Sequence, residues 1–342
     1  MSTICKTIIL FSVLTLSACG GGSSNKSTNH SNSIEPTLTV QSILDNAVKD
    51  GVDGIFVYID QPNHINESFT SGVQDKSAQV PANASSLFKI ASISKLFIAV
   101  SAVKIITAEQ LALDQTLAFW LPELADRIEN STTITIKHLI QHRSGIPDFD
   151  SQVGFSWQRS YTDIDRTLLY ALDKPADFLP DSQYEYSNTN YLLLAKILDK
   201  ALGYSHQSFI RDNILSPLSM SNTFLTLSEI DLSQLSKGYW DNIERSTQDY
   251  IIPGGSMIST VEDIAIFIRA LNKGDLLTAT EKSTYSNLYW FDHSGWLPGY
   301  QSIAQFDEQT NAVVVLFINT TGGDSETIAS ATNKSIIDLL AL

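Results

Sequence analysis

The sequence predicts a mixed α/β fold in which one antiparallel sheet is built from both ends of the chain and flanked by helices. Residues 54–59 and 67–72 have the apolar pattern of two strands near the start of the domain, and residues 301–306 and 313–318 have it near the end. From about residue 107 to residue 249 the patterns indicate helices and loops. The middle of the chain is therefore expected to form an all-helical insertion.

Each element has its own local pattern. The first two strands are joined by a turn near Pro62 and Asn63, and a buried helix begins near Ser92, with apolar residues at spacings of three and four up to Ile106. Gly203 is placed to cap the helix at 191–202. Further helices are expected at 135–141, 163–172, 205–215, 262–271 and 325–342, and a further strand at 288–292.

The N-terminus has the pattern of an exported protein. Residues 1–18 combine Lys6 with an apolar run too short to cross a bilayer, as in a signal peptide. The following Leu16-Ser17-Ala18-Cys19-Gly20 resembles a bacterial lipobox, which implies lipidation of Cys19; the alternative is an ordinary cleavage site that contains a cysteine. Residues 19–37 are polar and rich in small residues, as in a flexible tether. The domain is expected at 38–342, anchored to the bacterial cell envelope at the outer membrane by lipid alone.

Composition excludes several classes of protein. The net charge is −15 without a basic cluster, which argues against nucleic acid as a partner. The only cysteines are Cys5 and Cys19, so the domain has no thiol for a disulfide or for catalysis. No histidines are spaced as metal ligands, so neither a metal nor a cofactor is expected. We expect a monomer.

Three short motifs follow one another in the order of a serine acyl-transfer site: Ser92-Ile93-Ser94-Lys95, Tyr186-Ser187-Asn188 and His293-Ser294-Gly295. Decoys exist, because Ser23, Ser86 and Ser101 also precede a lysine by three residues, and residues 285–287 repeat Tyr-Ser-Asn. Only Ser92 lies where a helix begins, with Lys95 on the same face and free backbone N–H groups near a reacting carbonyl.

The predicted chemistry is nucleophilic catalysis by Ser92. A serine hydroxyl needs a base, and the two candidates are Lys95, if burial lowers its pKa, and the phenol of Tyr186. The sequence leaves open which of them is the kinetic base. Asn188 can hydrogen-bond both Lys95 and a substrate amide.

Five segments resemble the superfamily of serine β-lactamases and penicillin-binding proteins, in the branch related to DD-peptidases and class C β-lactamases. They are 88–95, 142–148, 186–191, 253–260 and 293–300, so the resemblance covers most of the chain after residue 39. It implies the β-lactamase/DD-peptidase fold, and an oxyanion hole formed by the N–H groups of Ser92 and Trp296. Residues 277–289 depart from the family pattern, because little chain separates Leu277 from Tyr289 and the hairpin before the last motif is therefore expected to be short.

The third motif is expected on an inner edge strand facing the site. Gly295 would let the substrate backbone approach, Ser294 would donate to a substrate carboxylate, and His293 stands where relatives have lysine. A histidine is only partly charged near neutral pH, so His293 is expected to attract an anionic substrate weakly and in a pH-dependent way.

The sequence therefore predicts a hydrolase that passes through an acyl-Ser92 intermediate. The first interpretation is a D-alanyl-D-alanine carboxypeptidase, a penicillin-binding protein or a β-lactamase-like enzyme, whose substrate is a peptidoglycan stem peptide or a β-lactam. The alternatives are a carboxylesterase on the same fold and a non-catalytic binding lipoprotein. Intact Ser92, Lys95, Tyr186 and Asn188 argue against the last of these.

Overall fold

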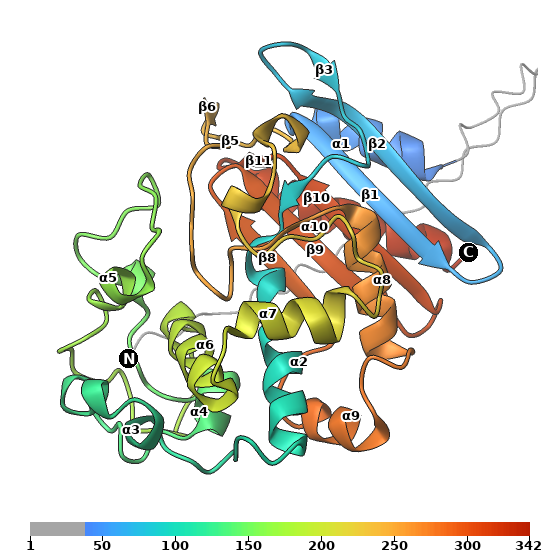
Figure 1. Cartoon of the computed structure of the whole chain (residues 1–342). Coiled ribbons are helices and arrows are strands. Elements are labelled where there is room, and N and C mark those ends of the chain that lie inside the picture. The colour runs from blue at the N-terminus through green and yellow to red at the C-terminus, as the bar shows by residue number, and fades with distance from the viewer. Residues whose placement is uncertain (1–37) are drawn as a thin grey trace, which may run out of the picture. The chain divides into compact units, whose positions relative to one another are not determined.

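The computed structural model describes residues 38–342, and its central element is a six-stranded antiparallel sheet (Figure 1). The order of its strands is β3-β2-β1-β10-β9-β8. Strand β1 from the start of the domain pairs with β10 from its end, with Ile55 opposite Ile318, which confirms the predicted sheet. The strands are β1 (Gly54–Gln61), β2 (Ile65–Asp75), β3 (Val80–Pro81), β8 (His293–Leu297), β9 (Tyr300–Asp307) and β10 (Ala312–Ile318).

Helices cover both faces of the sheet. On one face lie α1 (Val40–Lys49) and α10 (Ser325–Leu340), and on the other lies α8 (Val261–Asn272). Every residue of β10 is consequently buried, which explains its uninterrupted apolar sequence. Along β1, Ile55, Val57 and Ile59 join the apolar cluster with α1 and α10, whereas Phe56 and Tyr58 join the larger core on the other face.

The helical insertion lies between β4 (Phe88–Lys89) and β7 (Ile258–Ser259), which pair with each other. Its central helix is α2 (Ser94–Thr107), most of whose side chains are buried. Packed around α2 are α6 (Asn188–Leu202), which ends at Gly203 in the left-handed conformation as predicted, and α7 (His206–Ile210). The shorter helices are α3 (Leu117–Trp120), α4 (Ile136–Ile140) and α5 (Ile164–Leu168).

Some elements differ from the sequence prediction. The strand expected at 288–292 is wrong, because this segment is a turn and irregular chain that follows α9 (Ala279–Ser286), and pairing begins only at His293. Two of its apolar residues, Leu288 and Tyr289, are buried without strand pairing, and the hydroxyl of the buried Tyr285 in α9 donates to the carbonyl of Trp290. The predicted helix at 205–215 continues after Ile210 as a π turn.

Capping boxes begin two helices that the apolar pattern missed, α1 after Thr39 and α9 after Thr278. A small sheet was also missed. It consists of β5 (Tyr239–Trp240), β6 (Ile243–Glu244) and β11 (Thr320–Thr321).

Candidate active site

Ser92 lies in a tight 3-10 turn, Ala91–Ile93, between β4 and α2. The serine thus precedes the first α-helical residue, Ser94, and its N–H belongs to the N-terminal turn, where backbone donors lack helical partners. Ala91 adopts a positive φ of 51°, a conformation that L-residues rarely take and that often accompanies functional turns.

The decoy motifs do not form such a site. The hydroxyl of Ser101 donates to the carbonyl of Phe97 within α2, and that of Ser86 donates to Gln74. Tyr285 of the second Tyr-Ser-Asn lies buried in α9. Ser23, like the proposed signal peptide at 1–18, Cys19 and the tether at 19–37, lies outside the residues that the structure describes.

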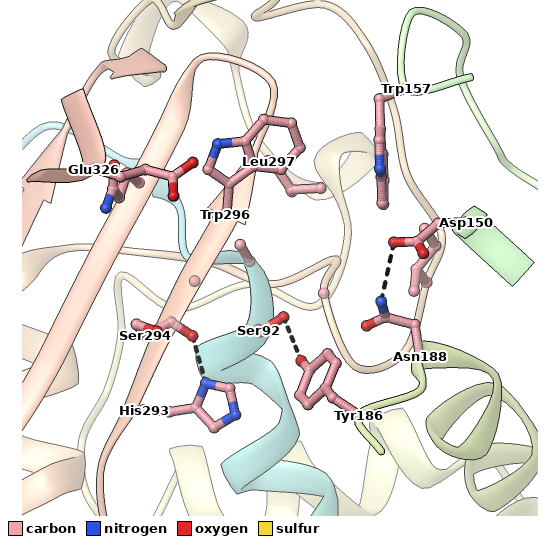
Figure 2. A pocket seen from close by; sticks show the side chains of 15 residues that line it. Ser92, Asp150, Trp157, Tyr186, Asn188, His293, Ser294, Trp296, Leu297 and Glu326 are labelled. Carbon is pink, nitrogen blue, oxygen red and sulfur yellow. Dashed lines mark hydrogen bonds between the residues drawn. The ribbon is translucent and has the colours of Figure 1, made fainter. Parts of the chain in front are cut away.

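The structure brings Ser92, Lys95 and Tyr186 together on one oxygen atom. The Oγ of Ser92 is 3.0 Å from the Nζ of Lys95 and 2.9 Å from the hydroxyl of Tyr186 (Figure 2 shows Ser92 and Tyr186). Since Ser92 and Lys95 are three residues apart at the start of a helix, they share its face. Tyr186 reaches them from the loop before α6.

Lys95 is 1% exposed, and its ammonium group is held by three acceptors. Besides Ser92, its Nζ donates to the Oδ1 of Asn188 at 2.8 Å and to the carbonyl of Gly254 at 3.0 Å. Burial lowers the pKa of Lys95 to about 7, against the opposing effect of Asp148 and Asp150. A sizeable fraction of this lysine is therefore neutral near pH 7 and able to accept a proton.

Gly254 makes room for this lysine. A Cβ at position 254 would lie 2.9 Å from the Cγ of Lys95 and 3.0 Å from the Cβ of Tyr191. The glycine pair at 254–255 therefore belongs to the serine site rather than to a phosphate loop.

Tyr186 is supported by His142. The two rings stack with centroids 4.4 Å apart, and the Nδ1 of His142 accepts a hydrogen bond from the N–H of Ser187. Burial raises the pKa of Tyr186 well above its ordinary value, so its phenol is protonated at neutral pH. In the resting enzyme, Lys95 is consequently the better base and Tyr186 the better proton donor.

Asn188 links Lys95 to two carboxylates that the sequence prediction did not include. Its Nδ2 donates to Asp148 at 3.1 Å and to Asp150 at 3.2 Å. Burial and the neighbouring Asp150 raise the pKa of Asp148 to about 7. The only sequence signal is that Asp148 ends the segment 142–148, which resembles the superfamily; Asp150 lies outside it, and nothing in the sequence places either residue beside residue 188.

The third motif forms β8, the edge strand of the sheet. A two-residue turn joins Leu297 to Tyr300 in the antiparallel pair β8–β9. Because ladder bonds alternate along such a pair, we expect the N–H groups of Ser294 and Trp296 to point away from β9. That is the orientation that a donor to the oxyanion or to a bound substrate needs.

Gly295 has a structural requirement that differs from the predicted one. A Cβ at this position would lie 2.5 Å from the carbonyl oxygen of Ile90 and 2.9 Å from the Cβ of Ala91. The glycine lets β8 pack against the turn that carries Ser92, so protein packing by itself requires a glycine at this position.

His293 differs from the prediction in its charge. Its Nε2 lies 3.0 Å from the hydroxyl of Tyr289, and its Nδ1 contacts the carbonyl of Ser294. Burial, with Lys95 nearby, lowers the pKa of His293 to about 4. Desolvation thus outweighs the hydrogen bond to Ser294, and the imidazole is neutral at pH 7 instead of partly charged.

A cavity of about 340 Å³ opens beside Ser92 (Figure 2). Among residues 38–342, no lysine or arginine lines it, and its two carboxylates are Asp150 and Glu326. Trp157 from the helical insertion and Trp296 from β8 approach each other with ring centroids 6.2 Å apart. The cavity lining is Ala91, Ser92, Asp150, Trp157, Tyr186, Asn188, Ile252, Gly255, His293, Ser294, Gly295, Trp296, Leu297, Gln301 and Glu326.

Residues 38–342 contain neither a side-chain group suited to a metal ion nor a helix suited to a membrane. No group of three or more histidine, cysteine, aspartate or glutamate side chains is arranged to hold a metal ion. No helix in this part of the chain is long and apolar enough to cross a membrane.

Comparisons with known proteins identify the family of the chain and its fold. The family described as Beta-lactamase matches residues 41–289. Penicillin-binding protein 4* of Bacillus subtilis (strain 168) is 26% identical over 279 residues, which are 68% of this chain and 60% of that protein. Penicillin-binding protein 4 of Amycolatopsis lactamdurans is 28% identical over 62% of this chain and 57% of its own length. The chain therefore spans less than two thirds of these relatives.

Solved structures share the fold over nearly their whole length. The D-amino acid amidase from Ochrobactrum anthropi SV3 superposes with a TM-score of 0.75 at 27% identity, covering 88% of this chain and 99% of the amidase. A penicillin-binding protein from Bacillus halodurans gives a TM-score of 0.72 at 19% identity over 86% and 98% of the two chains. The second likeness shows the fold alone.

Proposed function

The chain belongs to the beta-lactamase family, and from this premise we propose that it is a hydrolase that cleaves an amide or ester bond through an acyl-Ser92 intermediate. The observation that carries the proposal is that Ser92 Oγ is hydrogen-bonded to both Lys95 and Tyr186. A hydroxyl held between a neutralisable lysine and a protonated phenol has both a proton acceptor and a proton donor within reach.

In the proposed acylation, Ser92 Oγ attacks the substrate carbonyl carbon while its proton passes to neutral Lys95. The negative charge that forms on the carbonyl oxygen is stabilised by the N–H groups of Ser92 and Trp296. When the tetrahedral intermediate collapses, the bond to the leaving group breaks, and Tyr186 gives its proton to the leaving nitrogen or oxygen. The proton on Lys95 then returns to the Tyr186 phenolate, so that both groups are neutral again, and water attacks the acyl-serine in the same way to release the acid and free Ser92.

The charge of the cavity bears on the type of substrate. A D-alanyl-D-alanine peptide or a penicillin carries a carboxylate, and the relatives named as penicillin-binding proteins support this first candidate. Against it, the cavity lining within residues 38–342 has no lysine or arginine, and His293 is neutral. We therefore favour an amidase or esterase reaction on a substrate without a carboxylate next to the scissile bond.

We also propose that the enzyme acts in the cell envelope, held by a lipid on Cys19. This rests on the signal-like residues 1–18 and the lipobox-like residues 16–20 alone.

The proposal is tested by labelling with a fluorophosphonate and with a fluorescent penicillin, followed by intact-mass analysis. We expect one fluorophosphonate adduct on wild type, none on Ser92→Ala, and an unchanged adduct on the matched control Ser101→Ala. Hydrolysis of a p-nitrophenyl ester, an amino-acid amide and a D-Ala-D-Ala peptide then ranks the substrates. An adduct on another residue, or a protein that binds these compounds without turnover, would contradict the proposed hydrolase and favour a binding lipoprotein.

A further inference from the structure

The geometry around Ser92 indicates which end of the cavity receives the acyl part of a substrate. Tyr186, the proton donor to the leaving group, lies beside His293, with ring centroids 6.4 Å apart. The leaving group is therefore expected at this end. The acyl part extends the other way, towards Asp150, Trp157 and Trp296, which lie on the opposite side of Ser92 in Figure 2.

Asp150 presents a carboxylate to this acyl end without a cationic partner. One oxygen accepts from Asn188, the carboxyl of Asp148 is a second side-chain partner, and among residues 38–342 the carboxylate forms no salt bridge. Trp157 lines the same cavity and is drawn above Asp150 in Figure 2. An aromatic face beside a carboxylate stabilises an ammonium group, because both attract positive charge.

A second, independent observation concerns Gln301, which lies on β9 opposite Trp296 and lines the same cavity. Its side chain is 7% exposed, and its Oε1 has no hydrogen-bond donor in the described part of the chain. Leaving a buried polar group unpaired is costly, so the site is expected to receive a donor from a ligand.

We propose that the acyl part of the substrate carries an ammonium group, which Asp150 binds beside the indole of Trp157, and that Gln301 accepts a further N–H of the same acyl part. The substrate class is an amino acid or short peptide with a free amino group, joined through its carbonyl to an amine or alcohol. This inference rests on the proposed serine hydrolase, because it assumes that Tyr186 donates a proton to the leaving group and so places that group beside His293.

The other charges around Asp150 agree with a cationic ligand. Lys95 and Asp148 are its ionisable neighbours, and a single lysine faces two carboxylates across Asn188. Glu326, exposed at the cavity rim, adds a further negative charge. The net charge of −15 attracts cations and repels anions before contact.

The test compares two substrates that differ only in the amino group: phenylalanine p-nitroanilide, in both enantiomers, and 3-phenylpropionyl p-nitroanilide. We expect wild type to have a higher kcat/KM for one phenylalanine enantiomer than for the des-amino compound. Asp150→Asn should lower this ratio at least tenfold, because the amide keeps an acceptor for Asn188 but loses the charge. Gln301→Met should lower it about threefold, the scale of one neutral hydrogen bond.

Asp338→Asn is the matched control, because it removes the same charge on the exposed side of α10, outside the cavity lining, and it should change the ratio less than twofold. The contact with Asp150 is overturned if Asp150→Asn lowers kcat/KM equally for both substrates. That result would mean that Asp150 acts only through Asn188. It is also overturned if Asp338→Asn has as large an effect, or if wild type does not prefer the amine. An unchanged ratio in Gln301→Met overturns the second contact.

Labelling separates failure of this inference from failure of the proposed hydrolase. Fluorophosphonate still labels Ser92 if only the amine preference is wrong. If the anilides turn over too slowly, the test compares the concentrations of phenylalaninamide and of 3-phenylpropionamide that protect Ser92 from the label. The ratio of these two concentrations then replaces the ratio of kcat/KM values.

Discussion

Lys95 and Tyr186 converge on the same oxygen of Ser92, and the Nζ of Lys95 lies 5.0 Å from the centre of the Tyr186 ring. The two groups are buried together, and burial moves their pKa values in opposite directions, down for the lysine and up for the tyrosine. Each is thereby favoured in its uncharged form. A neutral amine and a neutral phenol on one hydroxyl can pass a proton in either direction.

Removing either group should slow acylation strongly. Lys95→Met and Tyr186→Phe are each expected to lower the rate of Ser92 acylation by roughly 10² or more, the usual scale for a positioned acid or base. The loss of rate in the double variant should be much smaller than the product of the two single losses, because the groups act as a unit. Stopped-flow acylation by a p-nitrophenyl ester measures this, with Lys104→Met as the control lysine. Near-wild-type rates in both single variants would exclude the mechanism.

The pH profile should follow Lys95. Since the neutral amine is the active form and its pKa is about 7, kcat/KM for a neutral ester should rise with pH through about 7 and then level off. The Asp148 carboxylate favours the charged lysine, so Asp148→Asn should move this limb to lower pH, by roughly half a unit to one unit. Asp338→Asn, on the exposed side of α10, should leave it unchanged. A limb that moves upward in Asp148→Asn would contradict this arrangement.

His293 should contribute no pH dependence between pH 5.5 and 8. Its pKa of about 4 keeps the imidazole neutral there, so an acidic gain on anionic substrates is not expected. The measurement is the ratio of kcat/KM for a D-Ala-D-Ala peptide to that for its C-terminal amide, followed across this range. The ratio should stay constant in wild type. In His293→Lys it should rise, because a lasting charge would attract the carboxylate. A wild-type ratio that increases as the pH falls towards 6 would mean that the imidazole titrates in this range.

Gly295→Ala should damage both stability and activity. The new Cβ would lie 2.5 Å from the Ile90 carbonyl, so β8 or the turn bearing Ser92 must shift. Overpacking of this kind costs about 1–3 kcal/mol in the free energy of unfolding. The control is Gly255→Ala, also in the cavity wall. A Cβ there would lie 3.8 Å from the carbonyl oxygen of Ile252, which is an ordinary contact distance. Urea unfolding and ester hydrolysis should separate the two variants; equal stability would show that the contact is easily relieved.

Anchoring should depend on Cys19. Mature protein from the native host is expected to begin at a lipidated Cys19 and to enter the detergent phase, whereas Cys19→Ala should remain an unlipidated precursor. Mass spectrometry of the N-terminal peptide and Triton X-114 partitioning measure this. An N-terminus at another residue would contradict the proposal.

The sequence by itself determined those features that depend on neighbours in the chain. Ser92 and Lys95 share a face because they are one helical turn apart, and α6 ends at Gly203 because glycine readily adopts the left-handed conformation. The strands at both chain ends were predictable from their apolar runs, since a strand covered on both faces needs no polar residues. The segment at 288–292 was mispredicted, because tertiary packing buries Leu288 and Tyr289 in an irregular segment just as strand pairing would.

Only the tertiary structure decided the charges and unmet hydrogen bonds of the site. Asp148 and Asp150 meet Asn188, and Gln301 enters the cavity, through contacts between segments distant in the chain. The neutrality of His293 follows from desolvation, which depends on every element packed around a group and not on its sequence neighbours. The packing requirement for glycine at position 295 likewise follows from its close approach to Ile90, which is distant in the chain. A motif specifies which groups can react, while the packing around them sets their protonation and the substrate they can accept.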